Sequence, residues 1–455
     1  MSASTKTELN AAYLLGRLER LPMSLWQVKL RLVVGTATFF DAFDALTIAY
    51  VMPVLIPLWH IKPGEIGLLL SISYVAQILG AIFIGWLSER IGRKKALMSS
   101  ILIMVVMSVA CALAWSYNSL FVFRFIQGLA LGAEVPIAAT YINEWSKKEG
   151  RGPFFVLYES IFNLGMIFTA LAATLAIPVF GWRVMFVIGI LPALVVPVLA
   201  KKYPESPRWM IDHGRYEEAE KSISLVEREI SEKYGKTLPP VQIVVENIEK
   251  KATKWSELFQ GIYCKRTLTL WVIMFAFYFI NYAMQTWLPT LYTSQFHVPL
   301  QQAFIYSLCV NVTSFVAMVI VGLIIDKVGR RLIFFLDFLG LAVICFLLWR
   351  TGIKTAQVLF WYTMVAGLFL NMASLVYLYA TEIYPTRMRA LGTSVSTSWV
   401  RIAAALGPNV VGLVLARYSL SAVFAVFATV GLIGLVIAAA FTEETKNRVL
   451  EEISP

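Results

Sequence analysis

The chain of 455 residues contains 58% hydrophobic and only 15% charged residues, and its mean hydropathy is +0.71. Soluble domains carry about 45–50% apolar and about 25% charged residues, so this composition excludes a soluble globular protein, a disordered chain and a disulfide scaffold. The net charge of +11 could indicate a nucleic-acid ligand. In a membrane chain, basic cytoplasmic loops beside anionic lipid explain the charge instead. The composition therefore indicates a polytopic protein of the lipid bilayer with no nucleic-acid partner.

Apolar runs long enough to cross a bilayer recur along the whole chain. A membrane-spanning helix needs about 20 mainly apolar residues. Twelve such runs cover approximately residues 32–58, 66–88, 96–115, 119–142, 153–178, 183–200, 267–292, 301–325, 332–349, 357–381, 390–416 and 420–441. Residues 1–27 lack the long apolar stretch of a cleavable signal peptide. The mixture of leucines and charges from Leu14 to Leu25 predicts a short amphipathic helix on the cytoplasmic surface instead.

Lys and Arg residues collect in alternate loops, which predicts the orientation of the chain. One set of loops carries Arg90, Arg93, Lys94, Lys95, Lys147, Lys148, Arg151, Lys327, Arg330, Arg331, Arg387 and Arg389, whereas the other carries Lys62, Arg183, Arg350, Lys354 and Arg417. Both termini and the polar loop 201–266 lie on the basic side, so we expect them to be cytoplasmic. The expected location of the protein is a plasma membrane or a bacterial inner membrane. The predicted domains are a cytoplasmic segment 1–27, a six-helix bundle 28–200, a helical linker 201–266, a second six-helix bundle 267–442 and a cytoplasmic tail 443–455.

Two sequence signatures occur twice at the same spacing. Gly85-Trp-Leu-Ser-Glu89-Arg-Ile-Gly92-Arg93-Lys94 is matched 237 positions later by Gly322-Leu-Ile-Ile-Asp326-Lys-Val-Gly329-Arg330-Arg331. Glu144 and Arg151 are matched 238 positions later by Glu382 and Arg389. Parallel halves related by an axis along the membrane normal are expected of a rocking transporter. The repeat therefore predicts an all-α membrane protein with twelve transmembrane helices in two pseudo-symmetric six-helix bundles.

The repeated signatures also predict a gate. Glycine permits neighbouring helices to approach closely, and an acid with a nearby arginine can form an intracellular charge network that latches the two halves while the cavity opens outward. The alternative is that these charges only end the helices and set the topology. The predicted gate residues are Gly85, Glu89, Arg93, Glu144, Arg151, Asp326, Arg330, Glu382 and Arg389.

Three further strings point to a known family. They are Arg124-Phe-Ile-Gln-Gly128-Leu-Ala-Leu-Gly132, Pro204-Glu205-Ser206-Pro207-Arg208-Trp209 and Glu382-Ile-Tyr-Pro-Thr-Arg387. With the repeat, they make the chain resemble the major facilitator superfamily over nearly its whole length. The Pro-Glu-Ser-Pro-Arg-Trp string resembles the sugar porter, organic ion transporter and synaptic-vesicle-protein-like branches and does not choose among them. The resemblance implies a secondary transporter that works by alternating access.

Charged residues inside membrane spans are costly, so each is a candidate functional residue. Asp41 and Asp44 share one face of the first helix. Two carboxylates at so short a distance in a medium of low dielectric constant cannot both ionise at little cost. This pair predicts proton coupling, while the alternative is a helix cap or a permanent pair with a cation. The Asp-x-x-Asp pattern is similar to that of bacterial aromatic acid–proton symporters and nicotinate transporters.

Arg401 lies near the middle of the span 390–416. Its guanidinium is always charged and fits a carboxylate in a bidentate manner. We expect it to bind an anionic substrate, and the alternative is a fixed salt bridge to Asp41, Asp44 or Glu134. In organic anion and aromatic acid transporters, which the chain resembles, an arginine at this place is associated with anionic substrates.

Other polar and aromatic residues complete the predicted site. The predicted substrate-binding residues are Arg401, Trp399, Tyr282, Gln285, Asn371, Tyr377 and Asn163, and the predicted proton-coupling residues are Asp41, Asp44, Glu134, Glu159 and Arg124. For Arg124, tuning a neighbouring acid and bracing its helix are equal alternatives. Asp337 and Arg350 lie nearer the ends of their span and are interpreted as interfacial.

The predicted function is proton-coupled uptake of a small organic anion by a monomeric secondary transporter. The pair in the first helix, Glu134 with Pro136, and Glu159 together most resemble nicotinate transporters, so a small aromatic monocarboxylate is the best guess. The alternatives are a proton–sugar symporter, an organic cation or drug exporter, and a non-transporting sensor. The chain has no Walker loop, which excludes pumping by hydrolysis, and no cysteine spacing for a metal. For a secondary transporter we expect no enzyme activity, no metal and no cofactor other than the proton as coupling ion.

Overall fold

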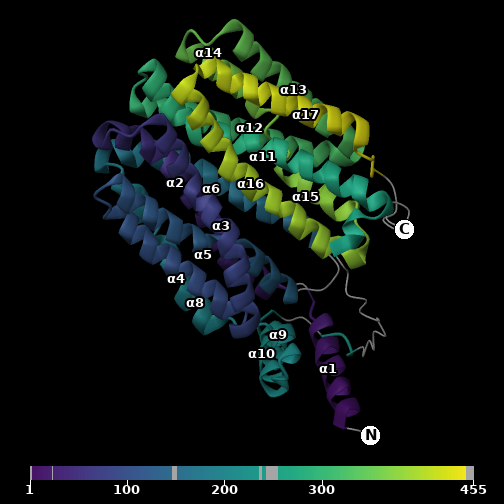
Figure 1. The fold of residues 1–455 in the computed structure, drawn as a ribbon. Helices are drawn as coiled ribbons and strands as arrows, with labels where there is room; N and C mark the ends of the chain where they lie inside the picture. The colour runs from purple at the N-terminus through teal and green to yellow at the C-terminus, as the bar shows by residue number, and fades with distance from the viewer. Residues whose placement is uncertain (1–2, 23, 146–150, 235–237, 242–254, 447–455) are drawn as a thin grey trace.

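The computed structural model describes residues 3–22, 24–145, 151–234, 238–241 and 255–446 (Figure 1). The side chains of residues 3–9, 133, 151–160, 233–234, 374, 386–387 and 390 are also outside this description. The helices before the linker are α1 (Ala3–Glu19), α2 (Leu25–Trp59), α3 (Pro63–Ile91), α4 (Arg93–Ala112), α5 (Tyr117–Glu144), α6 (Arg151–Phe180), α7 (Arg183–Ile188), the 3₁₀ turn η1 (Leu191–Leu194) and α8 (Val195–Lys202). They are followed by α9 (Pro207–Asp212), α10 (Tyr216–Tyr234), the 3₁₀ turn η2 (Trp255–Phe259), α11 (Gly261–Phe296), α12 (Leu300–Val328), α13 (Arg330–Thr351), α14 (Ala356–Gly367), α15 (Ala373–Glu382), α16 (Thr386–Arg417) and α17 (Leu420–Phe441).

The helices form two bundles that lie side by side, one from α2 to α8 and the other from α11 to α17 (Figure 1). Within the described residues, 11 helical segments are long and apolar enough to cross a membrane. The one remaining predicted span, 357–381, is the tenth in chain order, and turns at residues 368–372 divide it into α14 and α15. The two-bundle fold with twelve spans is therefore confirmed, with one span interrupted midway. Helix α1 and the C-terminal end of α17 lie at one end of the molecule, which we call the termini end (Figure 1).

Local sequence signals fix where several helices begin. Ser24 caps α2, because its hydroxyl accepts a hydrogen bond from the backbone of Trp26 while the Gln27 side chain accepts one from the Ser24 backbone. Gly92 and Gly329 separate α3 from α4 and α12 from α13 with φ angles of 101° and 102°. Only glycine adopts such angles at little cost. The chain therefore turns in the same way at the equivalent glycine of each copy of the repeated signature.

Small residues let α3 and α5 pack closely in the first bundle. A side chain at Gly80, Gly128 or Gly132 would collide with the backbone of the facing helix. The Gly128–Gly132 spacing is therefore a helix-packing feature.

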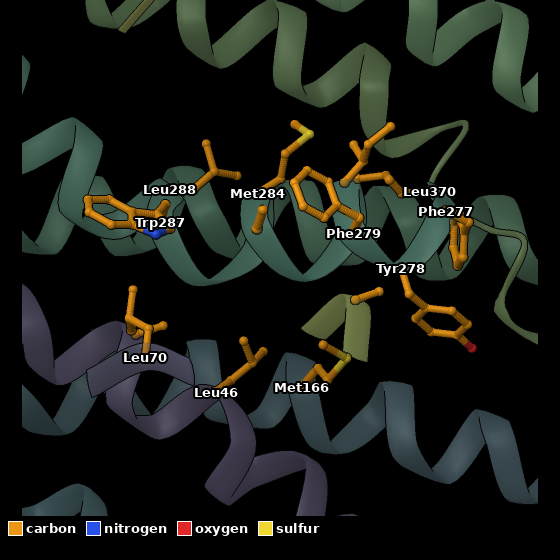
Figure 2. Close-up of a cluster of buried hydrophobic side chains, with 14 of the residues drawn as sticks. Leu46, Leu70, Met166, Phe277, Tyr278, Phe279, Met284, Trp287, Leu288 and Leu370 are labelled. Carbon is orange, nitrogen blue, oxygen red and sulfur yellow. The ribbon is translucent and has the colours of Figure 1, made fainter. Parts of the chain in front are cut away.

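Buried apolar side chains continue from one bundle to the other. Leu46, Leu70 and Met166 of the first bundle face Met284 and Trp287 of α11 across the interface (Figure 2). Hydrogen bonds also cross this interface: the Asn311 amide lies 3.3 Å from the Tyr50 hydroxyl, and the Asn409 amide donates to Ser71. These four residues lie in the halves of their helices that are farther from the termini end, so the bundles are joined there.

The N-terminal helix differs from the sequence-based expectation of a helix on the membrane surface. The apolar side chains of Leu14 and Leu18 are buried by protein, against residues of α9, α10 and α2. The Arg17 guanidinium lies 2.5 Å from the Glu227 carboxylate of α10, and this hydrogen bond raises the pKa of Arg17. The helix is amphipathic, as predicted, but its apolar face packs on the helices of the linker 201–266 rather than being free for lipid.

Candidate functional site

A cavity with a volume of about 120 Å³ lies between the two bundles. Its polar and aromatic lining comes from α2, α3 and α6 on one side and from α11, α15, α16 and the 368–372 turns on the other. The lining includes Asp41, Tyr74, Gln77, Asn163, Tyr278, Asn281, Tyr282, Gln285, Asn371, Tyr377 and Arg401. Six of the seven predicted substrate-binding residues, and one of the four predicted proton-coupling residues whose side chains the structure describes, therefore lie at one cavity.

Arg401 projects from α16 toward the first bundle. Its Nη1 donates to Oε1 of Gln77 at 2.6 Å, and its Nη2 donates to the carbonyl oxygen of Gly132 at 2.9 Å. Both acceptors are neutral, and among the described residues no carboxylate lies within ion-pair distance of Arg401. The guanidinium is near enough to Asp41 to stabilise its negative charge. The alternative of a fixed salt bridge to Asp41, Asp44 or Glu134 is not what this structure contains.

Asp44 and Arg124 form an ion pair inside the first bundle. Nη1 of Arg124 lies 2.7 Å from Oδ2 of Asp44, and 1% and 4% of the two side chains are exposed. The same nitrogen donates to Oε1 of Gln127 at 2.9 Å, and Nη2 reaches the Asp44 backbone carbonyl at 3.3 Å. Asp44 is therefore the acid that Arg124 holds, and neither side chain lines the cavity.

Asp41 and Glu134 are buried acids of a different kind. Oδ1 of Asp41 and both carboxyl oxygens of Glu134 have no hydrogen-bond partner among the described residues. Each side chain lies within the electrostatic range of the other. Asp41 lines the cavity, whereas Glu134, which belongs to α5, is not among the residues that line it.

Tyrosine rings form one wall of the cavity. The ring of Tyr282 lies 5.1 Å from that of Tyr74 in the other bundle and 5.8 Å from that of Tyr278. The ring of Tyr377 lies 6.5 Å from that of Tyr278. Aromatic walls of this kind can stack on a planar ring.

Amide side chains provide further polar groups at the cavity. Nε2 of Gln285 donates to Oδ1 of Asn281 at 3.0 Å, and Oε1 of Gln285 is buried without a partner among the described residues. The Asn163 amide lies 3.3 Å from the sulfur of Met318 in the other bundle. Polar groups from both bundles thus reach the same space.

Trp399 does not line the cavity, unlike the prediction. Its ring packs 5.2 Å from that of Trp271 and 6.1 Å from that of Phe275 on α11. Trp399 stands two positions before Arg401 in α16, and residues two apart do not share a helix face. This spacing explains why Arg401 faces the cavity and Trp399 does not.

Asp337 is deeply buried, which corrects its interpretation as an interfacial residue. Only 4% of it is exposed. The Asn371 amide donates to its Oδ1 at 3.1 Å and to the Leu368 carbonyl at 2.6 Å. Asp337 thus contacts the turns between α14 and α15 at the cavity wall. Arg350, by contrast, is exposed at the end of α13.

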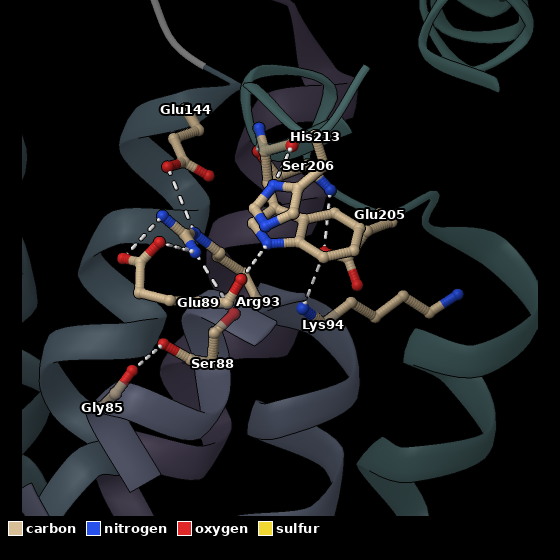
Figure 3. A network of polar contacts seen from close by, with 10 residues as sticks. Gly85, Ser88, Glu89, Arg93, Lys94, Glu144, Glu205, Ser206 and His213 are labelled. Carbon is tan, nitrogen blue, oxygen red and sulfur yellow. Dashed lines mark hydrogen bonds and ion pairs between the residues drawn. The ribbon is translucent and has the colours of Figure 1, made fainter. Parts of the chain in front are cut away.

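The repeated signatures form two equivalent charge networks at the termini end. Arg93 lies 2.9 Å from Glu89 and 3.4 Å from Glu144 (Figure 3). Arg330 lies 2.8 Å from both Asp326 and Glu382. The predicted networks are therefore present, and each lies within its own bundle rather than across the interface.

The remaining gate predictions have different outcomes. A Cβ at Gly85 would meet no atom within 4 Å, so no close helix approach occurs there in this arrangement. Nη2 of Arg389 lies 3.5 Å from the Tyr384 carbonyl. The predicted residues Arg151 and Glu159 fall in α6, but their side chains lie outside the described residues.

Several residues of these sites were missed from the sequence. Glu205 accepts hydrogen bonds from the backbone nitrogens of Lys94 at 2.9 Å and Lys95 at 3.4 Å, and Glu444 does the same for Arg330 at 3.0 Å and Arg331 at 3.1 Å. The signal was present, since Glu444 follows Glu205 at nearly the spacing of the repeat. Gln77 and Asn281 were also missed, because the sequence alone does not show which amides of the spans face the cavity.

Comparisons with known proteins agree with this geometry. The model of the family described as "Sugar (and other) transporter" matches residues 60–455. The niacin transporter NiaP of Acinetobacter baylyi is 32% identical, over 97% of this chain and 99% of that protein. The 4-hydroxybenzoate transporter PcaK of Pseudomonas putida is 29% identical, over 85% of this chain and 86% of that protein.

A solved structure shares the fold. The xylose transporter XylE from E. coli, in a partially occluded inward open conformation, superposes with a TM-score of 0.72 over 94% of this chain and 100% of that chain at 17% identity. The relatives are transporters rather than enzymes, and the apolar helices of this chain, long enough to cross a membrane, agree with that class. The chain belongs to the sugar (and other) transporter family, and it has the fold of a proton:xylose symporter of the major facilitator superfamily.

Proposed function

We propose that this transporter takes up a small aromatic monocarboxylate together with a proton, with nicotinate as the best guess. The observation that carries the proposal is Arg401, a guanidinium beside the central cavity with two neutral acceptors. A charge held at membrane depth calls for a counter-ion, and a substrate carboxylate would supply it. The names of the relatives NiaP and PcaK, transporters of niacin and 4-hydroxybenzoate, agree with an aromatic acid.

The cavity suits a planar ring next to a carboxylate. Arg401 retains N–H groups that are not used by Gln77 and Gly132, and these can bind a carboxylate with charge-assisted hydrogen bonds. The tyrosine wall that includes Tyr278 and Tyr282 would stack on the ring. Amide groups such as that of Asn371 would orient ring substituents.

Among the candidate acids, Asp41 and Glu134 suit proton coupling better than Asp44. A buried carboxylate without a partner is costly in its charged form, whereas one that is paired with a cation stays charged. Asp44 has Arg124 as its cation at 2.7 Å. Asp41 lies at the cavity and interacts electrostatically with both Glu134 and Arg401, so its proton and the substrate anion would affect each other.

In the proposed cycle, proton binding and bundle movement are linked. A proton from outside neutralises Asp41 or Glu134, and this lowers the cost of moving the acid-bearing helices relative to the second bundle. The termini end is proposed to be cytoplasmic, from the distribution of basic loops. The hydrogen bonds of Asn311 and Asn409 then close the outer side, which makes this an inward-facing arrangement.

The remaining assignments are part of the same proposal. We place the monomeric transporter in a plasma membrane or bacterial inner membrane, with the proton as its coupling ion and no other cofactor. Proton–sugar symport is the main alternative, and the match to the sugar (and other) transporter family is the observation in its favour. A neutral sugar does not, however, require the charge of Arg401 at the cavity.

Uptake into proteoliposomes tests the proposal. Labelled nicotinate and benzoate are supplied with and without an inward proton gradient, and glucose is measured in parallel. We expect gradient-stimulated uptake of the acids, mutual competition between them, and loss of uptake in Arg401→Ala. Arg350→Ala, which removes an exposed arginine at the end of α13, is the matched control. Glucose uptake without acid uptake would favour the sugar symporter instead.

A further inference from the structure

The orientation of Arg401 is set by the opposite bundle. Its Nη1 is held by Gln77 of α3 at 2.6 Å and its Nη2 by the Gly132 carbonyl of α5 at 2.9 Å. Arg401 itself belongs to α16 of the second bundle. Both hydrogen bonds therefore cross the interface between the bundles at the level of the cavity.

Pro136 explains why the Gly132 carbonyl is available. In an α-helix this carbonyl would accept a hydrogen bond from the backbone nitrogen four residues later. That residue is Pro136, which lies inside α5 and has no N–H. A carbonyl freed at membrane depth has to find another donor, and Nη2 of Arg401 is that donor.

The close packing of α3 and α5 brings the two acceptors together. A Cβ on Gly132 would collide with the backbone oxygen of Gln77, so the two residues lie against each other. The Gln77 amide and the Gly132 carbonyl thus form one rigid acceptor pair. Because this pair is neutral, it orients the guanidinium without cancelling its charge.

Resting on the proposed function, we propose that Gln77 and the Pro136-freed carbonyl of Gly132 are positioning groups for the anion site on Arg401. The site is then complete only while α3 and α5 face α16 at this depth. When the bundles separate here, Arg401 loses both acceptors and its fixed orientation, so its hold on the anion weakens. The affinity for the anion is thereby tied to the movement of the bundles, since a ligand shifts the balance between states by its difference in affinity.

Substitutions at Gln77 test the positioning role. Gln77→Glu is nearly isosteric and places a carboxylate on Arg401, so we expect the affinity for nicotinate to fall by more than about tenfold. Gln77→Met keeps the length but removes the acceptor, and we expect KM to rise by about three- to tenfold with little change in kcat. Binding of nicotinate and of 4-hydroxybenzoate is measured on the purified full chain in detergent, and uptake is measured in proteoliposomes.

Substitution of Pro136 tests the same proposal from the backbone. Pro136→Ala restores an N–H that competes with Arg401 for the Gly132 carbonyl, so KM should again rise. In an Arg401→Lys background, Gln77→Met should add little, because an ammonium group does not bridge two acceptors as a planar guanidinium does. A purely structural role of Gln77 would instead add its full effect in that background.

The controls separate this inference from the proposed function. Gln301→Glu makes the same substitution at an exposed position of α12 and should leave binding unchanged. Thermal unfolding shows whether each variant folds. If Gln77→Glu does not fold, Gln77→Met and Pro136→Ala still test the positioning role. If the wild type binds the acids and these variants bind them equally well, the positioning role is wrong and the proposed function stands. If the wild type binds neither acid, both proposals are overturned.

Discussion

Arg124 and Asp44 form a buried ion pair between α5 and α2, with 2.7 Å between Nη1 and Oδ2. Gln127 extends the pair, since its Oε1 accepts from Arg124 at 2.9 Å and its amide donates to Ser108 at 2.9 Å. Each of these side chains contacts another member, and only Nε of Arg124 lacks a hydrogen-bond partner among the described residues, so we interpret the network as a structural brace. The contact with Asp44 is compatible with both roles that the sequence left open for Arg124, which are bracing its helix and tuning a neighbouring acid.

Removing one member of this pair should destabilise the protein. Asp44→Asn leaves the Arg124 charge buried without a counter-ion, and we expect a loss of about 3–5 kcal/mol of folding free energy. The double variant Asp44→Asn with Arg124→Gln should recover part of this loss, because no lone charge remains. Thermal unfolding in detergent measures both, and a wild-type midpoint for Asp44→Asn would contradict the pairing.

Asp41→Asn should separate proton coupling from binding. The substitution keeps the shape of the neutral acid, and Oδ1 of Asp41 makes no hydrogen bond among the described residues, so stability should stay near the wild-type value. We expect exchange of nicotinate across the membrane to continue while accumulation driven by a proton gradient is lost. Uptake should also become insensitive to pH.

The companion variant Glu134→Gln shows which acid carries the proton. Counterflow and gradient-driven accumulation are compared in the same proteoliposomes. If accumulation survives in both single variants and in the double variant, neither acid couples the proton and the coupling assignment fails.

The fold could be predicted because hydropathy, basic loops and an internal repeat all report on it directly. The break between α14 and α15 could not, because residues 368–372 read as a continuous apolar helix. The turn there is stabilised by the Asn371 side chain, which donates to Leu368 and to Asp337 of another helix. A tertiary contact of this kind leaves no local sequence signal.

The capping acids Glu205 and Glu444 should contribute equally to stability in the two bundles. Each carboxylate accepts hydrogen bonds from the first backbone nitrogens of a helix, α4 or α13. Removing the charge in Glu205→Gln or Glu444→Gln should cost about 1 kcal/mol each, because it weakens an N-terminal cap.

Thermal unfolding of the two single variants measures this equivalence. Glu232→Gln is the control, since Glu232 pairs with Arg228 at an exposed site where such a pair contributes little. If only one of the two variants, Glu205→Gln or Glu444→Gln, loses stability, then the two caps do not contribute equally, although their structures are equivalent.

The site could be predicted only as far as residue type and helix face allow. Arg401 was identified because a charge in a span is rare. The spacing of Asp41 and Asp44 placed them on one face, but it could not show that Asp44 meets Arg124 while Asp41 meets the cavity. That distinction depends on how α2 is rotated against α5, which packing decides.

Asp337 should act on the substrate through Asn371. The Asn371 amide uses its donors on the Asp337 carboxylate at 3.1 Å and on the Leu368 carbonyl at 2.6 Å, and Asn371 lines the cavity. Asp337→Ala removes one acceptor and frees the amide to rotate, so KM for nicotinate should rise by about tenfold, the equivalent of about 1.4 kcal/mol. Asp337→Asn keeps an acceptor oxygen at the same place and should retain a KM near that of the wild type.

Transport kinetics in proteoliposomes distinguish a positioning role from a role of the Asp337 charge. The wild type, Asp337→Ala, Asp337→Asn and Asn371→Ala are compared at saturating and limiting nicotinate. If the acceptor oxygen matters, the two alanine variants resemble each other and Asp337→Asn resembles the wild type. If Asp337→Asn is as impaired as Asp337→Ala and loses its response to the proton gradient, then the ionisable group itself is required and Asp337 belongs with the coupling acids.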